Sequence, residues 1–183
     1  VERLFGVPAL IENSATAAAM AESLLGVGKS IPTFAYVNFA SGFGGGVILN
    51  RRLWRGIHGN SGQFAGVLKH CGAFVPNLET LRTTLAEHGS VTTSVDDLVT
   101  RFDLDWPGVE AWVHNAAKSV RLLSKIIADT IDVGTVVLGG RLPPALADRL
   151  ASASAIEQAD IDATQRRNRG QPAPKIIAAE VPQ

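Results

Sequence analysis

Apolar and polar positions along the chain predict an alternation of strands and helices. Residues 34–39 form a short apolar run that is typical of a buried strand, and residues 47–49 form a second one beyond a glycine-rich stretch. From residue 109 onward the apolar residues recur at helical spacing, which predicts a long helix with one buried stripe. That stripe comprises Val109, Trp112, Val113, Ala116, Val120, Leu123 and Ile127. Trp112 fits a place in the core, with a dimer contact or a ligand contact as the alternatives.

Capping and stop signals bound the other elements. The alanine-rich segment 14–25 ends at Gly26 and Gly28, and Gly89 ends another helical segment. Ser94 precedes two acidic residues, as helix N-caps often do, and Pro107 opens the long helix. The same signals predict helices over 14–25, 78–87, 94–102 and 144–150, strands over 135–138 and 175–179, and a continuation of the second strand at 53–54. This alternation places the chain in the α/β class.

Composition narrows the function classes. The chain has 183 residues, of which 46% are hydrophobic and 19% charged, and this predicts one well-packed domain. A single cysteine excludes an internal disulfide and fits a reducing cytoplasm, and no apolar run is long enough to cross a membrane. The formal net charge is zero, and the basic cluster at 166–169 reads as a solvated loop. We therefore expect this segment alone to bind neither DNA nor a membrane.

The run Ser41-Gly42-Phe43-Gly44-Gly45-Gly46 is the most distinctive local motif. It lies between the two apolar runs and predicts a strand, a tight glycine turn and a second strand. Its four glycines would permit positive φ angles and a close approach of backbone N–H groups to an anion. The motif predicts a phosphate loop inside a β-hairpin, with a plain tight hairpin as the alternative.

Three further segments accompany the glycine run in a fixed order. They are Glu12-Asn13-Ser14-Ala15, Gly59-Asn60-Ser61-Gly62-Gln63-Phe64-Ala65-Gly66 and Val137-Leu138-Gly139-Gly140-Arg141. Together these segments resemble the ROK family of sugar kinases and sugar-responsive repressors. The resemblance implies the C-terminal lobe of an actin-like ATPase (ribonuclease H-like) fold, with residues 1–183 as a single domain. It also implies that a first lobe and any helix-turn-helix would precede residue 1.

The departures from the family pattern concern catalysis. The family has its general base, an aspartate, where this chain has Ser14, and a serine hydroxyl has no pKa suited to that role near neutral pH. Losing such a base commonly costs two to four orders of magnitude in rate, about 3–5 kcal/mol. Ala40 stands at the family's first glycine of the turn, Gln63 at a sugar-binding glutamate and Gly66 at a histidine. We expect no catalytic residue and no kinase activity.

The family's zinc site is also incomplete. It uses three cysteines and the histidine that is replaced by Gly66, whereas this chain has Cys71 alone beside His70. The other three histidines have no ligand-like spacing to this pair. We expect no bound metal and no other cofactor.

Four residues keep side chains suited to a sugar. The resemblance assigns Asn13, Asn60, Gln63 and Glu79 to a ligand site, because amides and carboxylates hydrogen-bond sugar hydroxyls. Asn13 has an alternative role as a helix N-cap, and Glu79 has one as a first-turn acid. The phosphate-loop-like positions are Gly42, Gly44, Gly45, Gly46, Gly139 and Gly140, the last two beside the family's nucleotide site.

The favoured function is the effector-sensing and dimerisation domain of a ROK-type transcriptional regulator of sugar metabolism. It would be a homodimer that binds a sugar or sugar phosphate and reaches DNA only through an N-terminal domain outside this chain. One alternative is an ATP-dependent hexose kinase with altered chemistry. A third is a degenerate structural protein with neither ligand nor DNA.

Overall fold

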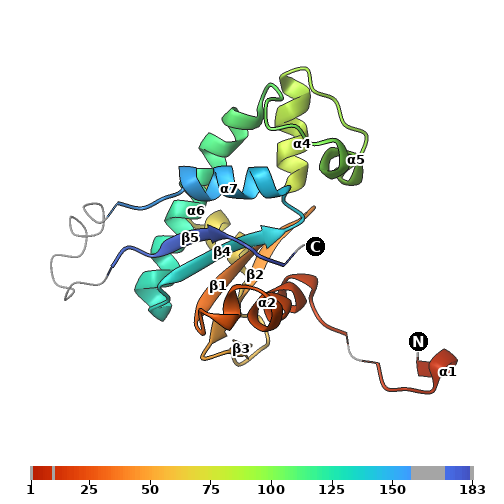
Figure 1. The fold of residues 1–183 in the computed structure, drawn as a ribbon, viewed down its shortest axis with the longest axis vertical. Coiled ribbons are helices and arrows are strands. Elements are labelled where there is room, and N and C mark those ends of the chain that lie inside the picture. Colours follow the sequence, from red (N-terminus) through yellow and green to blue (C-terminus); the bar gives the residue numbers. More distant parts are fainter. Residues whose placement is uncertain (1, 10, 158–171, 182–183) are drawn as a thin grey trace.

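A mixed five-stranded sheet organises the chain. The computed structural model describes residues 2–9, 11–157 and 172–181. The strand order is β3-β2-β1-β4-β5, with β1 at the centre (Figure 1). The pairs β1–β2 and β2–β3 are antiparallel, and the pairs β1–β4 and β4–β5 are parallel. The strands span Phe34–Phe39 (β1), Phe43–Leu49 (β2), Arg52–Trp54 (β3), Thr135–Gly140 (β4) and Lys175–Ala178 (β5).

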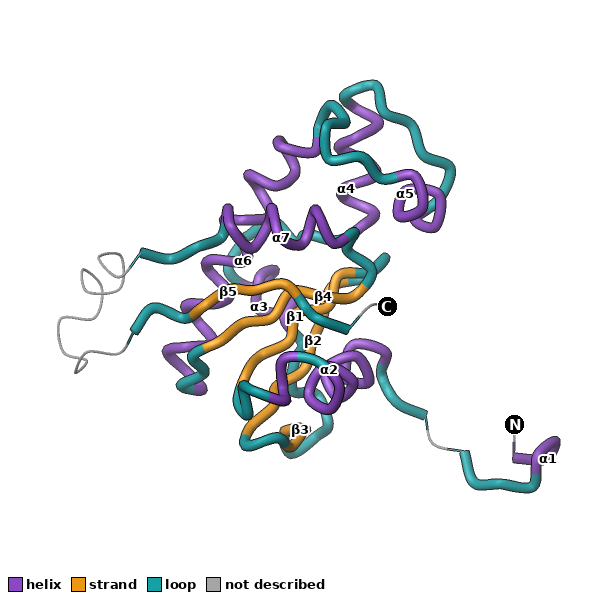
Figure 2. The backbone as a smooth tube through the Cα atoms, viewed as in Figure 1, coloured by secondary structure: helices purple, strands orange, loops and turns teal. Residues whose placement is uncertain are grey.

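Helices cover both faces of the sheet (Figure 2). Successive residues of β1 point to opposite faces, so Phe34 and Tyr36 pack with the helix α2 (Ser14–Leu25). Ala35, Val37 and Phe39 join the larger core on the other face. That core includes side chains of α3 (Phe64–His70), α6 (Val109–Ile131) and α7 (Pro144–Ala153). The α/β class is confirmed.

Helix α6 has the predicted buried stripe. All seven residues predicted for it are at most 2% exposed, and the helix begins at Val109, two residues beyond Pro107. The Trp112 side chain is fully buried, and its Nε1–H donates to Thr80 Oγ1 at 3.0 Å. Trp112 is therefore a core residue that joins α6 to α4 (Leu78–Glu87).

Most predicted boundaries agree with the structure. Helices α2 and α4 have the predicted limits, and Ser94 caps α5 (Val95–Arg101) by accepting from the Asp97 N–H at 3.0 Å. The second apolar run ends in a turn, so 52–54 forms a separate strand instead of continuing it. The prediction missed α1 (Glu2–Phe5), the 3₁₀ helix η1 (Val27–Lys29) and α3. The basic cluster at 166–169 lies outside the described residues.

The predicted hairpin of two strands is present, but its turn does not lie at Gly42–Gly46 as predicted. The chain reverses at residues 40–42, where Ala40 N–H donates to Gly42 O, and Gly44, Gly45 and Gly46 lie inside β2. None of the four glycines of the run has a positive φ. A Cβ at Gly46 would lie 2.7 Å from Ala19 Cβ on α2, and one at Gly45 would lie 2.5 Å from the Phe64 ring. These glycines therefore allow close packing on both faces of β2, and their role as a phosphate loop stays a prediction.

No helix in the described ranges combines the length and the hydrophobicity that a membrane span requires.

Candidate functional site

A cavity of about 290 Å³ opens where α2 begins and β1 ends. Three segments form its wall: the start of α2, the end of β1 with the following reversal, and the loop that precedes α3. The lining residues are Asn13, Ser14, Ala15, Thr16, Asn38, Ala40, Gly42, Phe43, Gly44, Gly45, Gly59, Asn60, Ser61, Gly62 and Gln63. Three of the four predicted sugar ligands, Asn13, Asn60 and Gln63, thus come together.

Asn13 lines the cavity and also caps the start of α2. Its Oδ1 accepts hydrogen bonds from the N–H groups of Ala15 (2.9 Å) and Thr16 (3.3 Å), so the N-cap alternative applies. The Asn13 carbonyl accepts from the Ala17 N–H, and Ser14 follows in the cavity wall. Because the cap occupies N–H groups of the first turn, the helix start offers few free donors to a ligand.

Glycines shape the loop that carries Asn60 and Gln63. Gly56, Gly59 and Gly62 have φ angles of 69°, 72° and 93°, which favour glycine. A Cβ at Gly62 would lie 2.3 Å from Gly45 O, so the loop lies directly against β2. Gln63 occupies the N-cap position of α3 without a side-chain capping bond. Its amide is therefore not used to cap the helix.

The sequence prediction missed three polar residues of the cavity wall, Thr16, Asn38 and Ser61. Asn38 lies on β1 between Gly44 of β2 and Gly139 of β4, and the residue is 7% exposed. Its amide makes no hydrogen bond to another described residue and faces the cavity. Ser61 stands where the family pattern has alanine, and its buried hydroxyl also has no partner there. A polar residue inside the apolar run 34–39 was the available signal for Asn38.

The part of the cavity wall that the structure describes is electrically neutral, since none of its residues is ionisable. Glu12 precedes Asn13 but pairs with Arg55, and both residues line a separate shallow hollow. The hydrogen bond from Arg55, and next that from the Asn13 N–H, hold the pKa of Glu12 below its ordinary value. The nearest acid along the chain is therefore ionised and committed to another partner.

Glu79 does not line this cavity. It lies in the first turn of α4, where its Oε2 accepts from Arg82 Nε at 3.0 Å. This arrangement matches the alternative of a first-turn acid, and a role for Glu79 in sugar binding stays a prediction.

Gly139 and Gly140 belong to a second cavity, of about 360 Å³, between the β4–α7 turn and residues 178–181. Gly140 has a φ of 84°, and its N–H donates to the Tyr36 hydroxyl at 2.7 Å. A Cβ at Gly139 would lie 2.3 Å from the same hydroxyl oxygen. The six glycines predicted as phosphate-loop-like therefore do not form one site: Gly42, Gly44 and Gly45 line the first cavity, and Gly46 lines neither.

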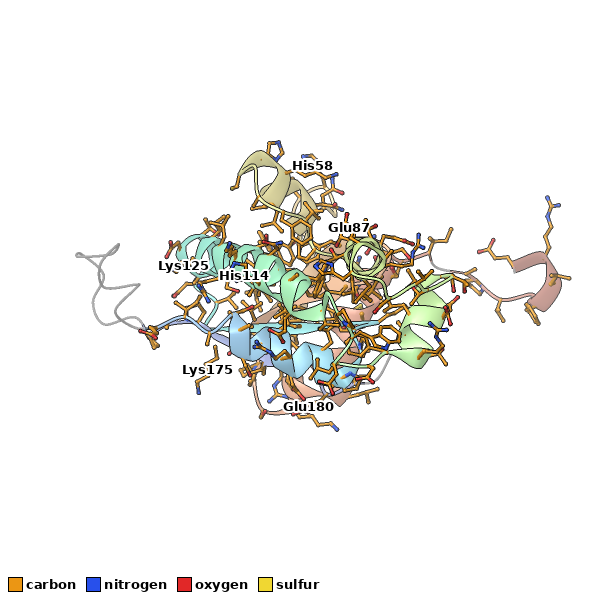
Figure 3. The ribbon with its side chains drawn as sticks, turned by 90° about the horizontal axis from the view of Figure 1, so that it is seen from above. His58, Glu87, His114, Lys125, Lys175 and Glu180 are labelled. Carbon is orange, nitrogen blue, oxygen red and sulfur yellow. The ribbon has the colours of Figure 1, made fainter. Side chains whose placement is uncertain are left out.

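In the described ranges, no three His, Cys, Asp or Glu side chains are grouped so that they could hold a metal ion. Cys71 is exposed, and His70 Nδ1 lies 2.6 Å from Gly66 O. Figure 3 shows His58 and His114 apart from one another, on the loop before α3 and on α6. The absence of metal stays a prediction.

The strand order and the helices on both faces of the sheet are those of the actin-like ATPase fold, as in solved ROK kinases, which confirms the predicted fold. The ROK family model matches residues 1–180, and the chain belongs to the ROK family. The sequence is 40% identical over 63 residues to the xylose repressor of Bacillus subtilis, covering 34% of this chain and 16% of that protein. It is 38% identical over 80 residues to the beta-glucoside kinase of Listeria monocytogenes, covering 43% of this chain and 27% of the kinase.

A solved structure gives the same assignment. The ROK hexokinase of Thermus thermophilus is 26% identical, with a TM-score of 0.61 over 98% of this chain and 62% of the hexokinase. The chain thus spans less than two thirds of the length of these relatives. Both a repressor and kinases occur among these relatives. Membership of the family therefore does not decide between a regulatory and a catalytic role.

Proposed function

We propose that this chain is the sugar-sensing and dimerisation region of a ROK-family transcriptional regulator and has no kinase activity. The observation that carries the proposal is the neutral wall of the first cavity. Asn13, Asn60 and Gln63 supply amides to one space of about 290 Å³, and none of the described residues that line it is ionisable. Amides both donate and accept, so they suit sugar hydroxyls.

The same wall argues against phosphoryl transfer. A sugar hydroxyl that attacks a phosphate needs a group to take its proton, and a suitable group must lie within hydrogen-bond reach. Ser14 occupies the position of the family's base, and its hydroxyl is a poor base near neutral pH. Glu12 is held by Arg55 outside this cavity. Binding can therefore survive where proton transfer cannot.

A regulator requires more than a sugar site. The xylose repressor among the relatives suggests that the effector is a sugar and that the output is DNA binding. We assign DNA binding to a domain outside residues 1–183 and expect the protein to be a homodimer, since palindromic half-sites match a two-fold protein. The sugar would act by binding one of two dimer arrangements more tightly than the other.

The second candidate is a ROK sugar kinase with altered chemistry. The similarity to the beta-glucoside kinase favours it. Its requirement is a base supplied from outside the cavity wall described above.

The deciding experiment pairs catalysis with binding on the full-length protein. A coupled ADP-release assay with ATP and a panel of hexoses and pentoses should stay at background, and the variant Ser14→Asp should stay there too because Gln63 and Gly66 also depart from the pattern. A thermal-shift screen of the same sugars should find at least one that stabilises the protein. At a hundred times its dissociation constant that sugar should add about 2.7 kcal/mol. Turnover of any sugar at enzymatic rates would overturn the proposal in favour of the kinase.

A further inference from the structure

We infer that Asn38 determines ligand specificity in the first cavity, and that it selects an uncharged polyhydroxylated ligand over the phosphorylated or acidic form. The inference rests on the proposed function, because it concerns the ligand of the same site. It assigns a role to a residue outside the family motifs from which the other contacts were predicted.

The position of Asn38 points to a ligand contact. The residue lies on the central strand β1, and the side chains on either side of it along this face are Tyr36 and Ala40, the first in the core and the second in the cavity wall. Both cross-strand neighbours, Gly44 and Gly139, lack a side chain. The amide therefore has no neighbour across the sheet that covers it, and it lines the cavity.

The Asn38 amide is available to a ligand. The residue is 7% exposed, and its amide makes no hydrogen bond to another described residue. The amide reaches the cavity, since it is not among the described side-chain atoms that are sealed from solvent without a partner. The Oδ1 is held in place, because a Cβ at Gly140 would lie 2.8 Å from it. A ligand hydroxyl in the cavity would replace water at this amide.

The charge around Asn38 sets the class of ligand. Seven polar side chains of the described residues line the cavity, and all are neutral: Asn13, Ser14, Thr16, Asn38, Asn60, Ser61 and Gln63. The start of α2 does not replace a cation, since Asn13 already accepts from the Ala15 and Thr16 N–H groups. A phosphate or carboxylate would lose water here without gaining an ion pair. A neutral polyol exchanges water for amides at little cost.

The test compares three sugars with their phosphate esters. Calorimetric titration of the full-length protein uses D-glucose, D-xylose and N-acetyl-D-glucosamine, each beside its phosphate ester. We expect an uncharged sugar to bind at least about tenfold more tightly than its ester. Asn38→Leu should weaken that sugar about five- to tenfold, in line with the loss of one or two hydrogen bonds. Asn115→Leu, an exposed residue of α6, is the matched control and should bind as the wild type does.

The stability of the unliganded variants separates contact from structure. Asn38→Leu removes an amide that makes no hydrogen bond to another described residue, so the melting temperature of the variant should equal or exceed that of the wild type. Asn38→Asp tests the same site if the leucine variant does not fold, because a carboxylate still accepts from a hydroxyl but repels a phosphate. The dissociation constant of this variant for the sugar should stay within a few-fold of the wild-type value. The ratio of its affinities for the sugar and for the phosphate ester should be larger than in the wild type.

Each outcome bears on one conclusion. If a sugar binds but the Asn38 variants bind it equally well, or if the esters bind as tightly, the role of Asn38 is refuted and the proposed function stands. If none of the six compounds binds the wild type, the sugar-sensing function fails and the inference fails with it.

Discussion

Replacing Glu22 should destabilise this protein far more than replacing an exposed acid. Glu22 lies on the buried side of α2, where its exposure is 0%. Its two carboxylate oxygens accept three backbone N–H bonds, from Val27 (3.0 Å), Glu180 (2.9 Å) and Val181 (3.0 Å). One side chain thus joins α2 and η1 to the segment that follows β5 and lines the second cavity.

The size of the effect follows from these bonds. A hydrogen bond to a charged group contributes about 1.5–3 kcal/mol, and a buried donor left unpaired costs about 1–3 kcal/mol. Water can replace part of the loss at Glu180, which is exposed, so the three bonds will not add in full. We expect Glu22→Ala to lower the free energy of unfolding by about 3–5 kcal/mol. For a chain of this length that corresponds to roughly 6–20 °C in melting temperature.

Urea and thermal unfolding followed by circular dichroism measure this difference. Glu87→Ala is the matched control, since Glu87 is exposed at the end of α4 and lies on the opposite side of the molecule from Glu180 (Figure 3). The free energy of unfolding of Glu22→Gln should lie between those of Glu22→Ala and Glu87→Ala. The glutamine amide keeps one acceptor oxygen, but its NH₂ group faces the backbone N–H donors. If the free energies of unfolding of Glu22→Ala and Glu87→Ala differed by less than about 0.5 kcal/mol, the Glu22 carboxylate would not stabilise the contact between α2 and the segment after β5.

Two further predictions concern small residues and metal. Gly46→Ala should lower the free energy of unfolding by about 1–3 kcal/mol, because its Cβ would lie 2.7 Å from Ala19 Cβ. Gly66→Ala in α3 should raise it by up to about 1 kcal/mol, because its Cβ would meet no atom within 4 Å. Equal unfolding midpoints for the two variants would refute this prediction. Elemental analysis should find far less than one zinc per chain, and a chelator should leave the melting temperature unchanged; stoichiometric zinc would show that His70 and Cys71 recruit further ligands.

Elements with local signals could be predicted from the sequence. The Asn77 side chain accepts from the Thr80 N–H, and Thr80 Oγ1 accepts in return from the Asn77 N–H, so the start of α4 depends on four consecutive residues. The stripe on α6 follows in the same way from spacing alone. These helices need no information from the rest of the chain, which is why their limits agree with the prediction.

Features that depend on distant contacts could not be predicted in this way. A run of glycines has the same local pattern whether it forms a turn or admits a neighbouring helix, and only the contact between Gly46 and Ala19 decides between them. Glu22 gave no local signal of burial, since its partners include Glu180, 158 residues away. Asn38 could be noticed as a polar residue in an apolar strand, but its place in the cavity depends on the sheet order and on the loop before α3.

The arrangement of α2 against β2 explains how a site can lose catalysis and keep binding. The loop before α3 lies directly on β2 in the cavity wall, since a Cβ at Gly62 would lie 2.3 Å from Gly45 O, and this contact needs no charged side chain. Binding a neutral sugar requires paired donors and acceptors in that space, which amides provide. Phosphoryl transfer requires in addition a base at one atom and charge to stabilise the phosphate. Under the proposed function, Ser14 and Gln63 stand where the family has acids, so the second requirement is unmet while the amides of the cavity wall remain.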